Sequence, residues 1–166
     1  MECHLPEPDV DKTLLNDLEL MRDTAYEAGK LAMEWYHKGA AVWDKSPDHP
    51  VTQADIEVND RIAQRLISAR PTYGWLSEET RDDPENRDVS RVFVVDPIDG
   101  TKAFINHEPY FCISIARLEK DVPVVGVIYN PCTDEMFEAV KEGGARLNGE
   151  TICANNQQTV EGTRML

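Results

Sequence analysis

The sequence predicts an α+β fold in which two long helices pack on one face of a largely antiparallel sheet. The first half of the chain holds two stretches whose apolar residues recur at steps of three and four, the spacing of an amphipathic helix face. The second half holds short apolar runs separated by tight turns, which is typical of an antiparallel meander. Helices that precede such a meander can cover one of its faces.

The first predicted helix starts at Thr13, after a loose leader over residues 1–12 that contains Pro6 and Pro8. Gly39 is a natural stop for this helix, since glycine readily adopts the left-handed conformation that ends helices. The predicted buried face consists of Leu14, Leu18, Met21, Ala25, Ala28, Ala32 and Trp35.

The second predicted helix begins after Thr52 and closes at Arg70-Pro71. Thr52 and Asp55 have the spacing of a capping box, so Asp55 has a structural role on the simplest interpretation. The preceding linker contains Pro47 and Pro50, and its Lys45 is by default a solvated surface charge. The apolar face of the helix is predicted from Ile56, Ala63, Leu66 and Ile67.

A wholly apolar run at Val92–Val95 predicts a strand that is buried on both faces and ends at Asp96. The sequence that follows, Asp-Pro-Ile-Asp-Gly-Thr, has two interpretations. One is a plain turn, in which Pro97 lacks an N–H group and Thr101 caps a short helix.

The other interpretation is a site for Mg²⁺ and phosphate. The carboxylates of Asp96 and Asp99, with the carbonyl of Ile98 between them, are hard oxygen ligands, and the amides of Gly100 and Thr101 can hold a phosphate. The spacing excludes an EF-hand loop, because the twelfth residue from Asp96 is histidine instead of glutamate. It also disfavours the Asp-x-Asp arrangement of phosphatases that form an aspartyl-phosphate.

Residues 73–77 predict another short strand, which runs directly into Glu78 and Glu79. Such a glutamate pair usually begins a solvated loop, and residues 81–88 are strongly polar. If this strand neighbours Val92–Val95 in one sheet, however, Glu78 and Asp96 share one edge. Convergent carboxylates repel one another unless a cation lies between them.

Five further strands are expected in the second half of the chain, and Asn148-Gly149 is a hairpin signal before the last of them. They are Phe111–Leu118, Val124–Tyr129, Met136–Val140, Ala145–Leu147 and Thr151–Ala154.

The composition excludes several classes of protein. The chain has 166 residues, the size of one domain, and 31 acidic against 17 basic residues give a net charge of −14. This charge argues against nonspecific binding to nucleic acid or to anionic membranes and suits capture of divalent cations. No signal peptide or membrane-spanning stretch is visible. Because Cys3, Cys112, Cys132 and Cys153 form no C-x-x-C pair, free thiols in a cytoplasmic protein are expected.

Four blocks together resemble the inositol monophosphatase family of Mg²⁺-dependent, lithium-sensitive phosphatases, which includes bisphosphate nucleotidases and some histidinol-phosphate phosphatases. The resemblance covers about residues 13–155. The blocks are Lys45 with Val51–Asp55, then Trp75–Glu79, then Asp96–Thr101, then Gly126–Pro131 with Gly143–Ala145 and Leu147–Gly149.

The resemblance implies the first half of an αβαβα sandwich phosphatase and a site with two to three Mg²⁺ ions. Glu78, Asp96 and the carbonyl of Ile98 would hold the first ion, and Asp96 and Asp99 the second. Glu79 would order waters around a weaker third ion. Asp55 and Thr101 would orient the attacking water, while the Gly100 and Thr101 amides take the phosphate oxygens.

Members of this family continue into a second half, where the aspartate of a Trp-Asp motif completes the second metal site. No such motif follows in this sequence, so residues 156–166 are expected to be a truncated tail, with the C-terminal domain absent and the second site incomplete. The expected function is hydrolysis of a small phosphorylated metabolite, an inositol monophosphate or a 3′(2′),5′-bisphosphonucleoside, by metal-activated water. The alternative is a catalytically weak metal- or phosphate-binding or interaction module that could form a homodimer.

Overall fold

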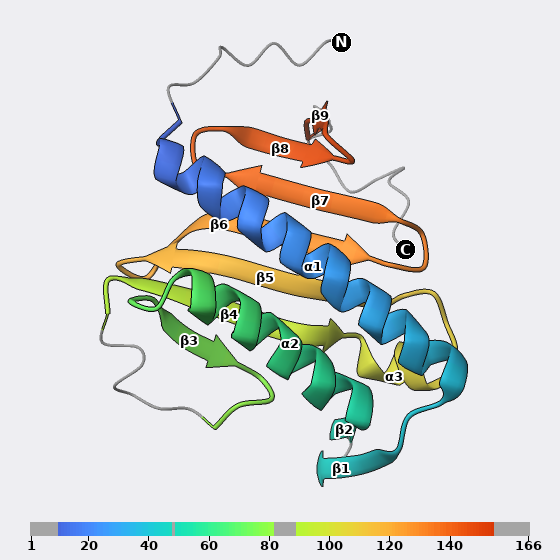
Figure 1. Cartoon of the computed structure of the whole chain (residues 1–166). Coiled ribbons are helices and arrows are strands. Elements are labelled where there is room, and N and C mark those ends of the chain that lie inside the picture. The colour runs from blue at the N-terminus through green and yellow to red at the C-terminus, as the bar shows by residue number, and fades with distance from the viewer. Residues whose placement is uncertain (1–9, 48, 82–88, 155–166) are drawn as a thin grey trace.

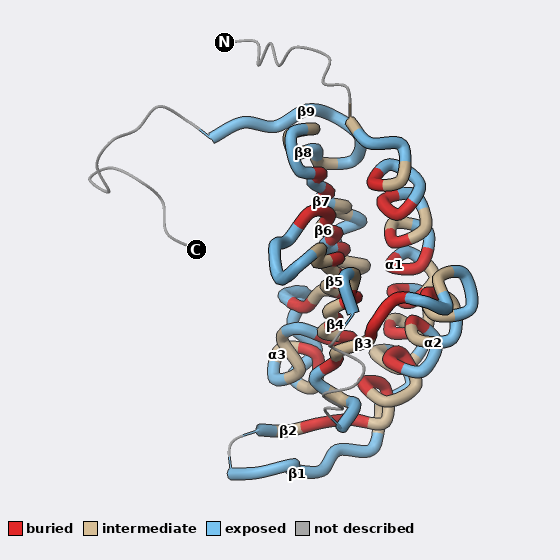
Figure 2. The backbone as a smooth tube through the Cα atoms, turned by 90° about the vertical axis from the view of Figure 1, so that its left-hand side faces the viewer, coloured by how far each residue is buried: buried red, intermediate tan, exposed pale blue. Residues whose placement is uncertain are grey.

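Residues 10–47, 49–81 and 89–154 are described by the computed structural model. Within these ranges the chain forms a seven-stranded sheet, a separate two-stranded hairpin and three helices (Figure 1). Helices α1 (Lys12–Lys38) and α2 (Gln53–Ala69) lie on one side of the large sheet, which Figure 2 shows edge-on. The predicted α+β architecture is therefore confirmed.

Helix α1 follows the predicted pattern closely. It begins one residue before the predicted start, because the side chain of Asp11 caps it by accepting a hydrogen bond from the Thr13 amide at 2.8 Å. Gly39, at φ 82°, ends it as expected. Six of the seven residues predicted for the apolar face are buried, and Trp35 is half-buried.

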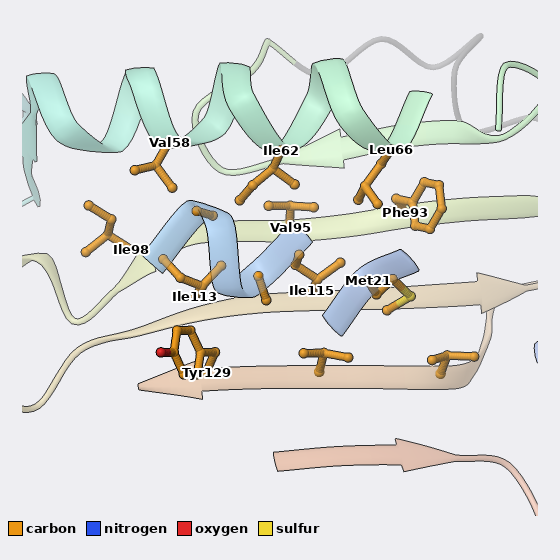
Figure 3. Packing of buried hydrophobic residues seen from close by; sticks show 14 of the residues in the cluster. Met21, Val58, Ile62, Leu66, Phe93, Val95, Ile98, Ile113, Ile115 and Tyr129 are labelled. Carbon is orange, nitrogen blue, oxygen red and sulfur yellow. The ribbon is translucent and has the colours of Figure 1, made fainter. Parts of the chain in front are cut away.

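Helix α2 has the predicted limits and the predicted capping box at Thr52 and Asp55. Its buried face was predicted correctly only at Leu66. Ile56, Ala63 and Ile67 are only half-buried, whereas Val58 and Ile62 join Leu66 in a fully buried row at steps of four that points at β4 (Figure 3). Adjacent stripes of this helix are both apolar, so spacing alone could not decide which one faces the sheet.

The large sheet contains β3 (Gly74–Ser77), β4 (Arg91–Asp99), β5 (Cys112–Glu119), β6 (Val122–Asn130), β7 (Glu135–Val140), β8 (Gly144–Leu147) and β9 (Glu150–Ile152), in this order across the sheet. Strands β3 and β4 are parallel, and every later neighbouring pair is antiparallel. The predicted meander is therefore confirmed, and the parallel pair joins it at one edge.

Strand β4 continues beyond its predicted end at Asp96 and reaches Asp99. Asp96 pairs with Ser114 and Asp99 with Cys112. The chain therefore advances three residues on β4 but only two on β5 between these two pairs. Pro97 has no N–H group to donate, which accounts for the irregular register at this point. The distortion leads directly into the short helix α3 (Thr101–Ile105).

The predicted linker between the two long helices is a hairpin of β1 (Val42–Ser46) and β2 (His49–Thr52), which pair only with each other. All five residues of β1 are exposed. A strand without a buried face shows no apolar alternation, and the two prolines of this segment favoured a loop.

The core between the helices and the sheet is tightly closed. Met21, Phe93, Ile113 and Ile115 are at most 1% exposed and lie between the helices and strands β4 and β5 (Figure 3). The opposite face of the sheet is different. Ile128, Phe137 and Ile152 are 46%, 38% and 37% exposed and, with small residues of neighbouring strands, line an apolar groove of about 280 Å³.

A polar network is enclosed at one end of the core. The carboxylate of Asp17, which is inaccessible to solvent, accepts hydrogen bonds from Arg70 Nε at 2.7 Å and Tyr73 Oη at 3.0 Å. The equally inaccessible Arg117 places its Nε 3.3 Å from Asp17 and donates from Nη2 to Glu119 at 3.1 Å. This network joins both long helices to the sheet.

The remaining expectations concern the cysteines, the polar loop, the chain ends and membrane-spanning segments. Cys112 and Cys132 are free thiols, but Cys153 is disulfide-bonded, so the expectation of free thiols throughout was wrong for Cys153. Residues 82–88 of the expected polar loop, most of the predicted leader and the predicted tail lie outside the described residues, and the domain limits stay predictions. No helix in the described ranges is long and apolar enough to cross a bilayer.

Candidate metal and phosphate site

The parallel pairing of β3 with β4 brings Glu78 and Asp96 together where that pairing ends. The two strands run in parallel with Ser77 opposite Val95, so Glu78 and Asp96 are the next residues in register. The Glu78 amide continues the ladder by donating to the Val95 carbonyl at 3.2 Å. The condition under which the sequence predicted a shared edge is therefore met.

The carboxyl of Asp96 is partly buried beside other carboxylates. Burial, followed by the charges of Glu78 and Asp99, raises the pKa of Asp96 from 3.8 to about 7, with a smaller contribution from Asp55. Together with Glu79 these side chains form the carboxylate cluster, defined here as Asp55, Glu78, Glu79, Asp96 and Asp99. At neutral pH the Asp96 carboxyl of the metal-free protein is about half protonated.

This pKa leads to a prediction for the metal-free protein. Between about pH 4 and pH 7 the folded state holds a proton on Asp96 that the unfolded state has already lost, so the free energy of unfolding falls as pH rises through this window. Urea unfolding in EDTA should show a larger loss of stability from about pH 5 to about pH 8 in the native protein than in Asp96→Asn. Equal losses in the two proteins would contradict the pKa assignment.

Glu79 is paired with Lys45, which was expected to be a solvated charge. The Glu79 side chain is only 4% exposed, and its Oε1 forms an ion pair with Lys45 Nζ. Burial raises the pKa of Glu79, and the hydrogen bond and charge of Lys45 oppose that rise. The second oxygen, Oε2, is buried without a hydrogen-bond partner.

Asp55 and Thr101, the two residues that the resemblance assigns to the attacking water, are in contact. One Asp55 oxygen accepts from the Thr52 amide at 2.8 Å and from the Thr52 hydroxyl at 2.5 Å, which completes the capping box. The other lies 3.2 Å from Thr101 Oγ1. Burial raises the pKa of Asp55, while the hydrogen bonds from Thr52 and Thr101 lower it. Asp55 therefore has both its structural role and the contact that the resemblance implied.

Thr101 does not cap α3, contrary to the turn interpretation. The N-cap is Gly100, without a side-chain cap, and Thr101 Oγ1 instead lies 3.1 Å from the Ile98 carbonyl and within reach of Asp55. A hydroxyl has one proton, so it donates to one of these two oxygens at a time. The distorted end of β4 thus directs the hydroxyl back toward the cluster.

Gly100 adopts a backbone conformation that requires glycine, with φ 96°. A Cβ atom there would lie 2.7 Å from the Tyr110 carbonyl oxygen. We expect Gly100→Ala to destabilise the fold by about 1–3 kcal/mol through strain and this collision. Gly149→Ala is the matched control, because Gly149 also has a positive φ of 83° but nothing within 4 Å of the added atom. Urea unfolding should therefore show a larger loss for Gly100→Ala; equal losses would exclude the collision.

No sequence pattern indicated that Cys112 would lie beside the cluster. Its Sγ lies 3.8 Å from Asp99 Oδ2, across the irregular part of the β4–β5 ladder. Burial, with a further contribution from the charge of Asp99, raises the pKa of Cys112 to about 12. The thiol therefore stays protonated at neutral pH and is a poor metal ligand.

The carboxylate cluster suits a hard divalent cation although its side chains are not closed around one. Among the described residues, no three His, Cys, Asp or Glu side chains form a finished metal-binding group. Electrostatic repulsion acts over longer distances than coordination bonds, which explains how Asp96 responds to its neighbours without such a group. One buried Glu79 oxygen has no hydrogen-bond partner, burial and neighbouring charges raise the pKa of Asp96, and the donors of the cluster are all oxygens, as Mg²⁺ prefers.

Comparison with known proteins identifies the class of fold first. The chain is similar to extragenic suppressor protein suhB from Bartonella henselae, with a TM-score of 0.83 and 34% identity, over 88% of this chain and 57% of that one. It also matches an IMPase/NADP phosphatase crystallised with Mg²⁺ and phosphate, at a TM-score of 0.75, over 84% of this chain and 53% of that one. At 20% identity the second match shows a shared fold alone.

The family follows from the sequence comparisons. Residues 16–165 match the inositol monophosphatase family model, and the chain belongs to this family. It is 40% identical over 138 residues to the inositol-1-monophosphatase of Rhizobium meliloti, covering 81% of this chain and 51% of that protein. The chain spans about half the length of the curated relatives it matches. The resemblance predicted from the four sequence blocks is confirmed.

Proposed function

We propose that the protein takes part in Mg²⁺-dependent hydrolysis of a small phosphorylated metabolite, a phosphomonoesterase reaction. The observation that supports this most directly is the meeting of Glu78 and Asp96 at the parallel strand ends, beside the Asp55–Thr101 contact. Metal ligands and a water-orienting pair are the two parts that direct attack of water on a phosphate monoester requires. Family membership supports the same reaction.

Each member of the cluster has a proposed role. Glu78, Asp96 and the Ile98 carbonyl are proposed ligands of a first Mg²⁺, and Asp96 and Asp99 of a second, while Glu79 orders waters near a weaker third. When bound, Mg²⁺ neutralises phosphate charge and lowers the pKa of a coordinated water. The count of two to three ions is part of the proposal.

Asp55 and Thr101 are proposed to orient the attacking water. When Thr101 donates its single proton to Asp55, its oxygen lone pairs are free to accept a hydrogen bond from a water molecule. Asp55 is itself fixed by two bonds from Thr52, so the direction of the hydroxyl is set by the start of α2. The amides of Gly100 and Thr101 are proposed to bind phosphate oxygens.

The substrate, location and assembly are proposed more broadly. An inositol monophosphate agrees with the name of the Rhizobium meliloti relative, and a 3′(2′),5′-bisphosphonucleoside is the second candidate. A cytoplasmic location and a homodimer complete the proposal. The exposed apolar groove beside Phe137 supports the alternative function, an interaction module that binds metal or phosphate without turnover.

The test is release of inorganic phosphate by the full chain. Inositol 1-phosphate, adenosine 3′,5′-bisphosphate and histidinol phosphate would be supplied with Mg²⁺, with EDTA, and with Mg²⁺ plus lithium. We expect release with at least one substrate, dependent on Mg²⁺ and reduced by lithium. Mg²⁺ binding without release from any substrate would favour the interaction module, and absence of both binding and release would overturn the metal site.

A further inference from the structure

Lys45 reaches the carboxylate cluster from a hairpin that is separate from the main sheet. In the β1–β2 ladder Asp44 pairs with Pro50 and Ser46 with His49, so Lys45 is the extra residue of a bulge. Bulges re-aim side chains and are frequent beside functional sites. Because all of β1 is exposed, burial of the strand does not account for the direction of this lysine.

The contacts of Lys45 are with the two glutamates that follow β3. Its Nζ pairs with Glu79 Oε1, lies 3.8 Å from Glu78 Oε1 and is 3.5 Å from the Glu78 carbonyl oxygen. In the described part of the chain, Glu78 and Glu79 each form one ion pair, and Lys45 is the partner in both. Its own side chain is 33% exposed, against 4% for Glu79, so a partly solvated ammonium neutralises a buried carboxylate.

A divalent cation and the Lys45 ammonium would compete for the same oxygens. An ammonium carries three donors and no lone pair, so it can pair with carboxylates but cannot join a metal's coordination shell. Two cations a few ångströms apart also repel each other. Entry of Mg²⁺ at the glutamate side of the cluster therefore favours movement of the ammonium into solvent, and the exposed hairpin leaves it room to move.

We propose that Lys45 is a tethered counter-ion that holds the Glu78–Glu79 side of the cluster in the metal-free protein and is displaced when a divalent cation binds. The inference rests on the proposed function, because it concerns the same cluster. Lys45 is a positioning residue in this account. It keeps the buried Glu79 carboxylate in place while no metal is bound, and in return it weakens the affinity for the ion.

Lys45→Met tests the proposal by Mg²⁺ binding and by thermal unfolding, without reference to activity. Titration calorimetry of the full chain should show Mg²⁺ binding that is about fivefold or more tighter than in the native protein, because the competitor is gone. In EDTA the same variant should unfold at a lower temperature, because Glu79 has lost its counter-charge. Mg²⁺ should therefore raise the melting temperature more in the variant than in the native protein.

Two controls separate this effect from simpler ones. Lys45→Arg keeps the charge and should bind Mg²⁺ within about twofold of the native protein. Lys141→Met removes an equivalent charge from an exposed position after β7 and should leave Mg²⁺ affinity unchanged. Equal tightening in Lys141→Met and Lys45→Met would reduce the effect to net charge and overturn the proposal.

The remaining outcomes are equally decisive. Unchanged or weaker Mg²⁺ binding in Lys45→Met, with normal binding in the native chain, would overturn the counter-ion role and leave the proposed function standing. If the native chain binds no Mg²⁺, the metal site itself fails and the inference fails with it.

Discussion

Asp96→Asn is expected to lower Mg²⁺-dependent phosphate release by at least about a hundredfold. The change keeps the size of the side chain and removes the charge at the centre of the cluster, where Asp96 is the proposed ligand common to two ions. Steady-state release at saturating Mg²⁺ measures the effect on turnover. A Mg²⁺ titration of the same variant should show weaker binding.

Loss of folding cannot account for that result if stability is measured in parallel. Asp96→Asn relieves repulsion in the metal-free protein, so at about pH 8 the variant should be at least as stable in EDTA as the native protein. Asp60→Asn, an exposed position on α2, is the matched control and should retain activity. Near-normal release from a well-folded Asp96→Asn would refute the assigned role.

Asp17→Asn is expected to lower the free energy of unfolding by about 3–5 kcal/mol, the largest stability effect predicted for this chain. Asp17 is the shared acceptor of Arg70 and Tyr73 and lies 3.3 Å from Arg117. Arg117 Nε and Nη1 are already buried without hydrogen-bond partners, so removal of the nearby negative charge leaves a buried cation poorly compensated. Urea unfolding followed by circular dichroism measures the loss.

The cause can be tested with a double-mutant cycle. Arg117→Met removes the buried cation that Asp17→Asn would leave without its partner. The free energy of unfolding of the double variant Asp17→Asn/Arg117→Met should therefore fall by less than the sum of the two single losses. Asp23→Asn, on the exposed side of the same helix, should change stability by no more than about 0.5 kcal/mol. Strict additivity in the cycle would show that Asp17 acts without Arg117.

The elements that the sequence predicted correctly carry local signals. Helix α1 has a long apolar stripe and a terminal glycine, and α2 has a capping box whose two partners are three residues apart. The hairpins of the meander have turn residues at short intervals, including Asn148-Gly149 with both residues at positive φ. Each of these features can be read within a window of a few residues.

The features that were missed depend on contacts between distant segments. The direction of Lys45 is set by a bulge in an exposed hairpin, and the continuation of β4 past Pro97 depends on its pairing with β5. The choice of Val58 and Ile62 over Ile56 as the buried face of α2 is made by the sheet against which the helix packs. No local pattern contains this information.

The candidate site could be predicted from the sequence only in part. The sequence motifs identified the candidate ligand oxygens. Whether the carboxylates of Glu78 and Asp96 lie close together depends on whether β3 and β4 are neighbours, which only the structure could establish. The turn interpretation made the hydroxyl of Thr101 the cap of α3, and the resemblance placed Thr101 with Asp55. The structure shows no such cap, and the hydroxyl contacts Asp55.

The two contacts of Asp55 couple the local stability of α2 to the orientation of Thr101. One oxygen of its carboxylate closes the first turn of α2, and the other holds Thr101. Native proteins continually open and reclose such helix ends. Each opening of this turn would free the Asp55 carboxylate and release Thr101 with it, so the lifetime of one helical turn would limit how long the proposed water-orienting contact persists.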